Sequence, residues 1–388
     1  MEKLISKYKK ILPDKNSIYY TAYITWLSIS LLFGRSTLKT FLGISTSFWL
    51  KKVCYPICGV LILIVFSVSG FMEKPNKKQL KQYFFMGILV GVFGISWILS
   101  DSGTFFMQLM FIIAAKEINL QKLPRITIVC QMIIVPIIIC LAMVGAIENI
   151  SFMYERINLE PVYRQSLGFR HPNALGAQIV QFCICWLWIR WEKWKWYDYF
   201  LYVTAIWLVY TICNSITSII LILLTGAMNG IYRLLIKIKH TKLLDDMISI
   251  CIWLIPAVCI IISYFYSETN PLITAADHIV SWRFKLANGF LRDNPATCIG
   301  TKLPPNIGSD CIYVDTITRY GWIILFFILL GMYRMLRYAI KNRMYPLIIS
   351  IFIFGIYGIT EHYPYLLMFN FTLIFLAYAI YGDTKRVT

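Results

Sequence analysis

Long runs of consecutive apolar residues recur along almost the whole chain, and they limit its fold more than any other feature. A helix needs roughly 20 apolar residues to cross a bilayer. Twelve runs approach that length, near residues 17–33, 53–72, 83–100, 103–115, 126–147, 172–189, 199–213, 217–233, 247–266, 321–336, 346–360 and 366–381. Because 59% of the residues are hydrophobic and only 14% are charged, the apolar side chains exceed what a soluble globule of 388 residues buries. We therefore predict an all-α, polytopic membrane protein with about twelve transmembrane helices, forming a single integral domain over residues 1–388. A soluble enzyme, a secreted disulfide scaffold and a disordered chain are excluded.

The distribution of Lys and Arg predicts the orientation. With the N-terminus inside, 25 of the 37 Lys and Arg residues fall in the inner segments and 12 in the outer ones. This satisfies the positive-inside rule, so we expect both termini in the cytoplasm and a membrane location without a cleaved signal peptide. It also accounts for the net charge of +18 without a nucleic-acid partner. Two outer loops are long, at 148–171 and at 267–320 between helices nine and ten, and loops of this length usually carry function.

The end of the first long loop combines polar groups with a helix start. Arg164, Arg170, His171 and Asn173 surround Pro172, which suits the first turn of a helix. A helix N-terminus beside arginines is suited to phosphate binding. The same cluster is also typical of an interfacial anchor whose arginines reach the lipid headgroups.

The second long loop contains further candidates. Residues 281–287 fit a short amphipathic helix that includes Arg283, whereas Lys285 and Arg292 fit a solvated surface. Asp310 lies before the tenth apolar run and could accept a proton from a sugar hydroxyl, or could serve only as a helix cap. Cys298 and Cys311 share this loop and are either paired or free thiols.

A short outer turn that contains Glu361 and His362 precedes the last apolar run. These two residues could form part of the wall of a site, or they could be a polar pair at the membrane interface. Residues 214–218 could line a cavity or simply make a turn. Nearly all these groups are predicted at the outer mouths of helices, which favours an electropositive site for a lipid-linked anion. No Cys/His set has metal-ligand spacing outside the bilayer, so we expect no metal and no cofactor. Guanidinium groups could then stabilise a diphosphate leaving group.

Three pieces of the chain resemble a known family. Gly168-Phe-Arg-His-Pro-Asn-Ala-Leu-Gly176 is similar to the G-F-x-H-P-N-x-x-G signature of capsule and exopolysaccharide polymerases. Two further matches are weaker. Asp310-Cys311 is followed after nine residues by Gly321, which resembles the family's spacing, and the turn at Glu361 resembles the family's acidic turn before the last span. These are motifs of the Wzy-type polysaccharide polymerases and their relatives, the O-antigen ligases. The motifs cover about thirty residues, while the expected topology covers most of the chain.

The resemblance implies a GT-C-like, metal-independent glycosyltransferase in the bacterial cytoplasmic membrane. It would polymerise undecaprenyl-diphosphate-linked repeat units into capsular polysaccharide or exopolysaccharide at the outer face, with membrane lipids and partners such as a flippase and a chain-length regulator. In the site that it implies, Arg170 and Arg283 hold the donor diphosphate with help from Arg164. Asp310 or His171 deprotonates the acceptor. The expected substrate-binding residues are Arg164, Asn173, Tyr313, Glu361 and His362.

The chain departs from the family pattern at four points. The ligases have His where this chain has Asp310, which favours a polymerase. The usual Asn is Cys311, a Gly is replaced by Ile324, and Ser215-Ile-Thr-Ser218 stands where a Ser-Arg pair is common. An O-antigen-type ligase and a transporter or flippase for lipid-linked oligosaccharide remain as alternatives. A transporter typically has repeats and ionisable groups at the membrane midplane, whereas this sequence shows no half-to-half repeat and few ionisable residues at that depth.

Overall fold

The computed structural model describes residues 14–68, 76–156, 159–304 and 307–382, and these are mostly helical. The α-helices are α2 (Lys15–Ile29), α3 (Thr46–Phe48), α4 (Tyr55–Val68), α5 (Lys77–Ser100), α6 (Thr104–Ala114), α7 (Leu123–Met143), α8 (Pro172–Arg190), α9 (Asp198–Leu208), α10 (Ile216–Lys237), α11 (Lys242–Tyr264), α12 (Pro271–Ile279), α13 (Arg283–Asp293), α14 (Ile312–Arg319), α15 (Trp322–Lys341), α16 (Tyr345–Tyr357) and α17 (Ala377–Tyr381). Short π-helical segments are η1 (Ser30–Arg35), η2 (Trp49–Cys54) and η5 (Val209–Cys213). Short 3-10 segments are η3 (Leu120–Lys122), η4 (Trp191–Lys193), η6 (Tyr363–Tyr365) and η7 (Phe371–Leu376). Two hairpins pair β1 (Thr40–Phe41) with β2 (Ile44–Ser45) and β3 (Ser151–Arg156) with β4 (Leu159–Gln165), both antiparallel.

Seven helical segments among the described residues are long and apolar enough to cross a membrane, which identifies a polytopic, membrane-embedded protein. They are Thr46–Ser67, Lys77–Ser100, Leu120–Met143, Pro172–Lys193, Ile216–Lys237, Lys242–Tyr264 and Trp322–Lys341. Helical structure also occurs in the other five predicted runs, but four of these helices are short, at Thr104–Ala114, Asp198–Cys213, Tyr345–Tyr357 and Phe371–Tyr381. The count of twelve spans and the orientation therefore stay predictions.

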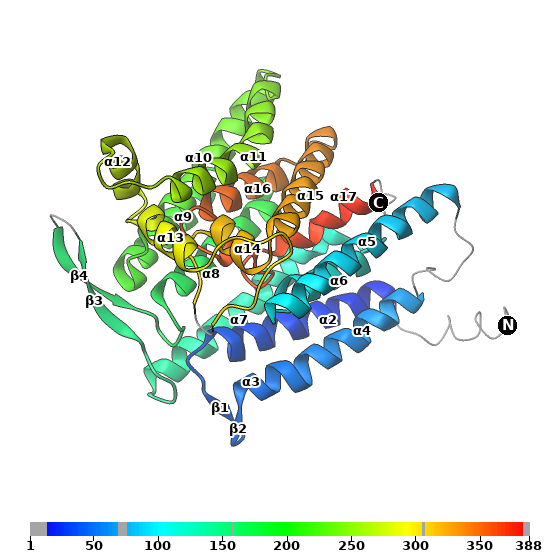
Figure 1. Cartoon of the computed structure of the whole chain (residues 1–388), viewed down its shortest axis with the longest axis horizontal. Coiled ribbons are helices and arrows are strands. Elements are labelled where there is room, and N and C mark those ends of the chain that lie inside the picture. Colours follow the sequence, from blue (N-terminus) through cyan, green and yellow to red (C-terminus); the bar gives the residue numbers. More distant parts are fainter. Residues whose placement is uncertain (1–13, 69–75, 157–158, 305–306, 383–388) are drawn as a thin grey trace.

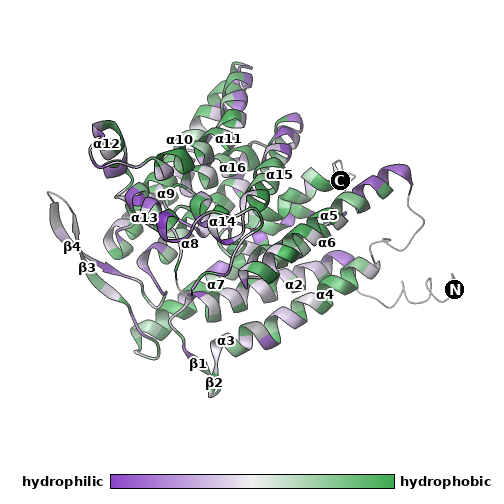
Figure 2. Ribbon diagram, in the orientation of Figure 1, coloured by the Kyte–Doolittle hydropathy of each residue, from purple (hydrophilic) through white to green (hydrophobic). Residues whose placement is uncertain are grey.

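Hydrophilic residues gather at the far ends of several long helices. In Figure 2 the ends of α5, α10, α11 and α15 that point to the upper right are coloured as hydrophilic, whereas their shafts are largely hydrophobic. Lys77, Lys237, Lys242 and Lys341 mark those four ends. Apolar shafts with cationic ends are the distribution that a bilayer favours.

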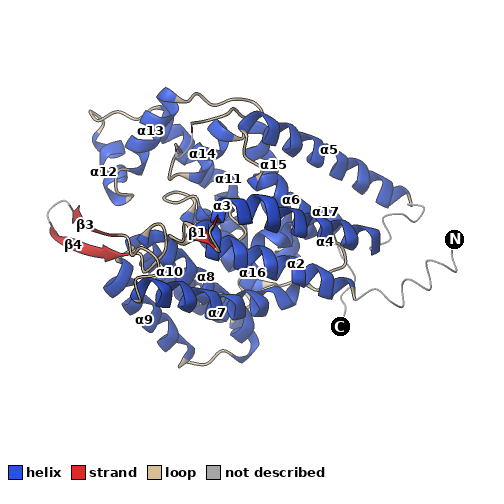
Figure 3. Ribbon diagram, turned by 90° about the horizontal axis from the view of Figure 1, so that it is seen from below, coloured by secondary structure: helices blue, strands red, loops and turns tan. Residues whose placement is uncertain are grey.

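Helix α8 lies in the centre of the bundle and carries the His171-Pro-Asn segment at its start. It packs against α7, α10 and α16, and far more of it is buried than of the other long helices. At Gly176 the backbone of α8 approaches α10 closely, because an added Cβ would lie 2.5 Å from Oγ of Ser218. Figures 1 and 3 show α8 enclosed by neighbouring helices in both views. A site at the start of α8 therefore rests on a rigid support.

The two long loops at 148–171 and 267–320 contain regular structure, of which the sequence analysis predicted only the short helix at 281–287. The first forms the β3–β4 hairpin, which projects away from the helices at the left of Figure 1. The second contains α12, α13 and α14. The amphipathic helix expected at 281–287 begins only at Arg283, because Ser281 and Trp282 have left-handed φ angles of 57° and 64°. Residues in this conformation end a helix rather than continue it.

Gly321 joins α14 to α15 and has a φ of +97°. The preceding loop packs directly on it, since the Trp322 and Ile323 N–H groups donate to the carbonyl oxygens of Thr297 and Cys298, each at 3.0 Å. These bonds satisfy the first N–H groups of α15, which otherwise have no partner. A Cβ at Gly321 would lie 2.5 Å from the Cys298 carbonyl oxygen.

We predict that Gly321→Ala lowers the free energy of unfolding by about 2 kcal/mol or more, because it combines a disfavoured φ with this backbone clash. Thermal unfolding of the detergent-purified protein measures the change. Gly289→Ala is the matched control, because nothing lies within 4 Å of an added Cβ at that position in α13. Its helix propensity should leave the melting temperature unchanged or slightly higher. Equal melting temperatures for the two variants would contradict the steric argument.

Candidate functional site

Three ionisable side chains that are far apart in the sequence meet beside the start of α8. Arg283, the first residue of α13, forms an ion pair through Nη1 with Oδ2 of Asp310. Its Nη2 lies 3.5 Å from Oε1 of Glu361. Glu361 is buried with 3% of its surface exposed, while Asp310 is partly exposed. One guanidinium group thus joins a buried carboxylate to a more accessible one.

A second chain of hydrogen bonds reaches Glu361 from the first long loop. Asn173, in the first turn of α8, donates from Nδ2 to Oε1 of Glu361 at 2.5 Å. Nη2 of Arg164, on β4, donates to Oδ1 of Asn173. Nε of Arg164 also donates to the Cys213 carbonyl oxygen at 2.8 Å. The predicted residues Arg164, Asn173, Glu361, Arg283 and Asp310 therefore form one continuous polar network.

Asp277, which the sequence analysis did not single out, fixes the start of α13. Its fully buried carboxylate accepts from the N–H groups of Phe284 at 2.7 Å and Lys285 at 3.2 Å. These N–H groups belong to the first turn of α13, where no intrahelical acceptor exists. Together with the left-handed Ser281 and Trp282, this arrangement presents Arg283 to the two carboxylates. A buried carboxylate seven residues before a helix turn has no recognisable sequence signal.

The environment of Glu361 favours its protonated form. Burial raises the pKa of Glu361 to about 7, and the nearby Arg283, Asn173 and Arg164 limit that rise. A carboxyl group with a pKa near the ambient pH is suited to general acid–base chemistry. Glu361 was predicted only as a substrate-binding residue of the site wall. Its pKa suits it to accept a proton as well.

His171 is held neutral and directed by a local hydrogen bond. Burial and the nearby Arg164 and Arg283 lower the pKa of His171 to about 4. Its Nδ1 accepts from the Asn173 N–H at 3.1 Å, so it caps α8. In a neutral imidazole whose Nδ1 is an acceptor, Nε2 carries the hydrogen. His171 thus has a hydrogen-bond donor at Nε2 and is poorly suited to the base role predicted for it.

His362 lies among several cations. Burial, together with the nearby Arg35, His171, Arg319 and Arg283, lowers the pKa of His362 to about 3. Arg35 and Arg319 were not predicted as site residues. Arg319 binds within α14, where its Nε lies 3.5 Å from Oδ2 of Asp315, whereas Arg35 ends η1. The neighbourhood is electropositive, in agreement with the expectation from the sequence.

Asp310, Glu361 and His362 place potential ligand atoms within 4.8 Å of one another, which raises the question of a metal ion. The donor set does not fit one. Arg283 bridges the two carboxylates, and a cation between them would have to displace this guanidinium group. Further arginines surround His362 and would repel a metal ion. The residues present are better suited to an anion.

Other predicted residues lie apart from this network. Tyr313 is buried in the bundle, and its hydroxyl donates to the Gly355 carbonyl oxygen at 2.5 Å, so it does not face a substrate at this site. Arg170 is exposed, and its Nε donates to the Ser36 carbonyl oxygen at 3.1 Å. Cys298 and Cys311 are both free thiols, the first exposed and the second buried. The hydroxyl groups of Ser215 and Ser218 form a hydrogen bond of 3.0 Å, and both residues pack against Gly176 of α8.

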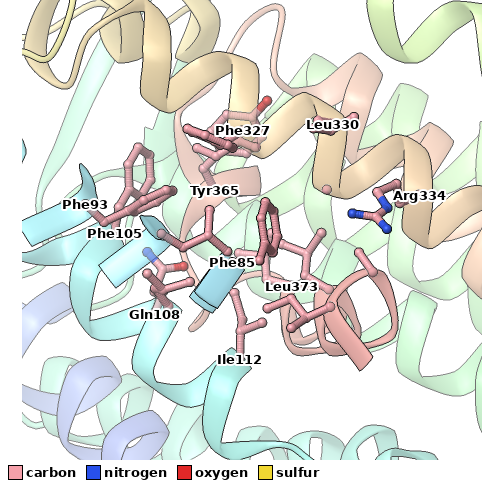
Figure 4. Close-up of a pocket in the computed structure, with 17 residues that line it drawn as sticks. Phe85, Phe93, Phe105, Gln108, Ile112, Phe327, Leu330, Arg334, Tyr365 and Leu373 are labelled. Atoms are coloured by element: carbon pink, nitrogen blue, oxygen red, sulfur yellow. The ribbon is translucent and has the colours of Figure 1, made fainter. Parts of the chain in front are cut away.

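An apolar groove lies between α5, α6, α15 and the η6–α17 segment. Figure 4 shows aromatic and aliphatic side chains converging on it, with Arg334 at the end opposite Phe93 and Phe105. Tyr365 lines the groove three residues after His362 and packs against Tyr313 and Phe105. Tyr365 therefore links the groove, along the chain, to the turn that carries Glu361 and His362.

Comparisons of the chain with family models, curated proteins and solved structures gave no match.

Proposed function

We propose that this protein is a polysaccharide polymerase of the outer face of the bacterial cytoplasmic membrane. It would transfer a growing glycan from undecaprenyl diphosphate to the next lipid-linked repeat unit. The observation that carries the proposal is the contact of Arg283 with Asp310 and with the buried Glu361, beside the Gly168–Gly176 segment that resembles the polymerase signature. The apolar groove supports a lipid-borne substrate, because it offers a surface for a hydrocarbon chain and is lined by Tyr365, three residues after His362.

The reaction makes one glycosidic bond and breaks one sugar–phosphate bond. The acceptor hydroxyl oxygen attacks the anomeric carbon of the donor sugar, and its proton passes to the Glu361 carboxylate. The bond from that carbon to the diphosphate oxygen breaks, and the diphosphate keeps the electron pair. Arg170 and Arg283 stabilise the charge that develops on the leaving group, as guanidinium groups do for phosphates.

The remaining network residues have positioning roles in this mechanism. Asn173 holds the Glu361 carboxylate, and Arg164 holds the Asn173 amide. Asp310 orients Arg283 and is exposed enough to reach an acceptor sugar. His171 donates a hydrogen bond from Nε2 to a substrate oxygen.

A reconstitution assay tests the proposal. Purified protein is incubated with synthetic undecaprenyl-diphosphate oligosaccharide, without added metal, and the products are separated by glycan length. A ladder of repeat units and released undecaprenyl diphosphate are expected. Transfer of a finished glycan to a different acceptor, with no ladder, would identify a ligase instead. Movement of labelled lipid between leaflets with no new glycosidic bond would identify a flippase.

A further inference from the structure

Arg35 and Arg170 face each other across a short backbone pairing that joins the first and third outer segments. The Arg170 N–H donates to the Arg35 carbonyl oxygen at 3.0 Å, and the Thr37 N–H donates to the Gly168 carbonyl oxygen at 2.8 Å. Between them Ser36 and Phe169 form an antiparallel bridge. In this register Arg35 is directly opposite Arg170. The two guanidinium groups are close enough to interact, because burial lowers the pKa of Arg35 and the charge of Arg170 lowers it further.

Two like charges in this position require an explanation. Like charges directly opposite each other destabilise an antiparallel pair. Among the residues that the structure describes, no ion pair is formed by either Arg35 or Arg170. Arg170 donates to a backbone oxygen, and the Arg35 guanidinium carbon lies 5.5 Å from the centre of the Phe369 ring. Neither contact neutralises a charge.

The surroundings add no compensating negative charge. His362 lies next to Arg35 and is neutral. Glu361 and Asp310 are both engaged by Arg283, and Asp315 lies next to Arg319. Arg283 is shared by two of these carboxylates and Arg319 neighbours the third, so none of the three forms an ion pair with Arg35 or Arg170 among the described residues.

We propose that Arg35 and Arg170 form an anion site that binds a phosphate-bearing group. Two neighbouring guanidinium groups supply paired N–H donors in the geometry that phosphate oxygens accept. The site itself rests on the pairing and the charges. Its ligand, the diphosphate of a prenyl-linked donor, rests on the proposed function. Arg35 is then a substrate-binding residue beside Arg170, in addition to Arg283, which also contacts the two carboxylates.

Direct binding to the full-length purified protein tests this site without relying on catalysis. Farnesyl diphosphate and inorganic pyrophosphate are the probes, and titration calorimetry measures each Kd. Arg35→Gln and Arg170→Gln should each weaken farnesyl diphosphate binding by about 10- to 100-fold, because each removes charge-assisted hydrogen bonds. Arg292→Gln is the matched control, since Arg292 is exposed on α13 and outside the network. It should bind as the unaltered protein does.

The two probes separate the source of the phosphate. Tighter binding of farnesyl diphosphate than of pyrophosphate supports a lipid ligand, and equal binding supports a site that reads phosphate alone, which overturns the prenyl assignment. If neither probe binds the unaltered protein, or if both variants bind like Arg292→Gln, the anion site is wrong. If Arg35→Gln does not fold, the binding measured for Arg170→Gln tests the site by itself. Arg170 is exposed, so its replacement should not prevent folding. Binding without any polymer in the reconstitution assay would refute the proposed function and leave the site intact.

Discussion

Replacing Arg283 by Lys is expected to abolish polymer synthesis while the protein still inserts into the membrane. The guanidinium group contacts Asp310 through Nη1 and Glu361 through Nη2, and a single ammonium group cannot reproduce this forked geometry. The expected loss of polymerisation rate is about 10²-fold or more, comparable to removal of a donor that stabilises transition-state charge. Arg170→Lys should have the same direction of effect through the leaving group.

Arg292→Lys provides the matched control for Arg283→Lys, because it makes the same exchange on an exposed position of the same helix. Polymer length is measured on glycan gels, and insertion is measured by the amount of protein extracted from the membrane fraction. If the membrane-inserted double variant Arg170→Lys, Arg283→Lys still makes full-length polymer, the assignment of these arginines is wrong.

Glu361→Gln is expected to slow polymerisation by about 10²- to 10⁴-fold, the contribution typical of a general base. Gln keeps the size of the side chain and an oxygen that can accept from Asn173, but it cannot take a proton. For the unaltered protein the rate should fall about tenfold per pH unit below pH 7 and level off above it, because the pKa of Glu361 is raised to about 7. A flat profile between pH 5 and 8 would contradict the role of Glu361.

The stability of Glu361→Gln separates a chemical role from a structural one. The pKa of Glu361 is higher in the folded protein than in the unfolded chain, so folding favours the protonated form. The stability that this shift contributes is fully present at low pH and is lost as the pH rises through 7. Gln resembles the protonated form, so the melting temperature at pH 8 should be equal to or higher than that of the unaltered protein. A large decrease would mean that the carboxylate mainly supports the fold.

The sequence predicted the helical framework because each apolar run must satisfy its own backbone within lipid. It did not predict where runs become short or irregular. The segment 366–381 divides into η7 and α17, and this change depends on packing against α6 and α15 rather than on composition. The β3–β4 hairpin, α12 and α14 were missed and only the first part of α13 was predicted, because short elements in polar loops leave weak periodic signals.

For the site, the sequence identified Arg164, Asn173, Arg283, Asp310 and Glu361, which the structure brings together. It misplaced Tyr313, since nothing in the local pattern shows that its hydroxyl bonds to the backbone of α16. It missed Asp277 and Arg35, because their partners lie across a turn and on another outer segment. Polar residue types predict candidates, whereas long-range pairing decides which of them meet.

The contacts of the site also constrain when the protein can begin to work during its own synthesis. The pairing of residues 35–37 with 168–170 spans the first half of the chain, and Arg283 and Glu361 must still follow. A ribosome-bound intermediate that ends before residue 361 lacks the buried carboxylate, however many of its helices are already in the bilayer. Under the proposed function, a nascent chain cannot act on its substrate until nearly all of it has been translated.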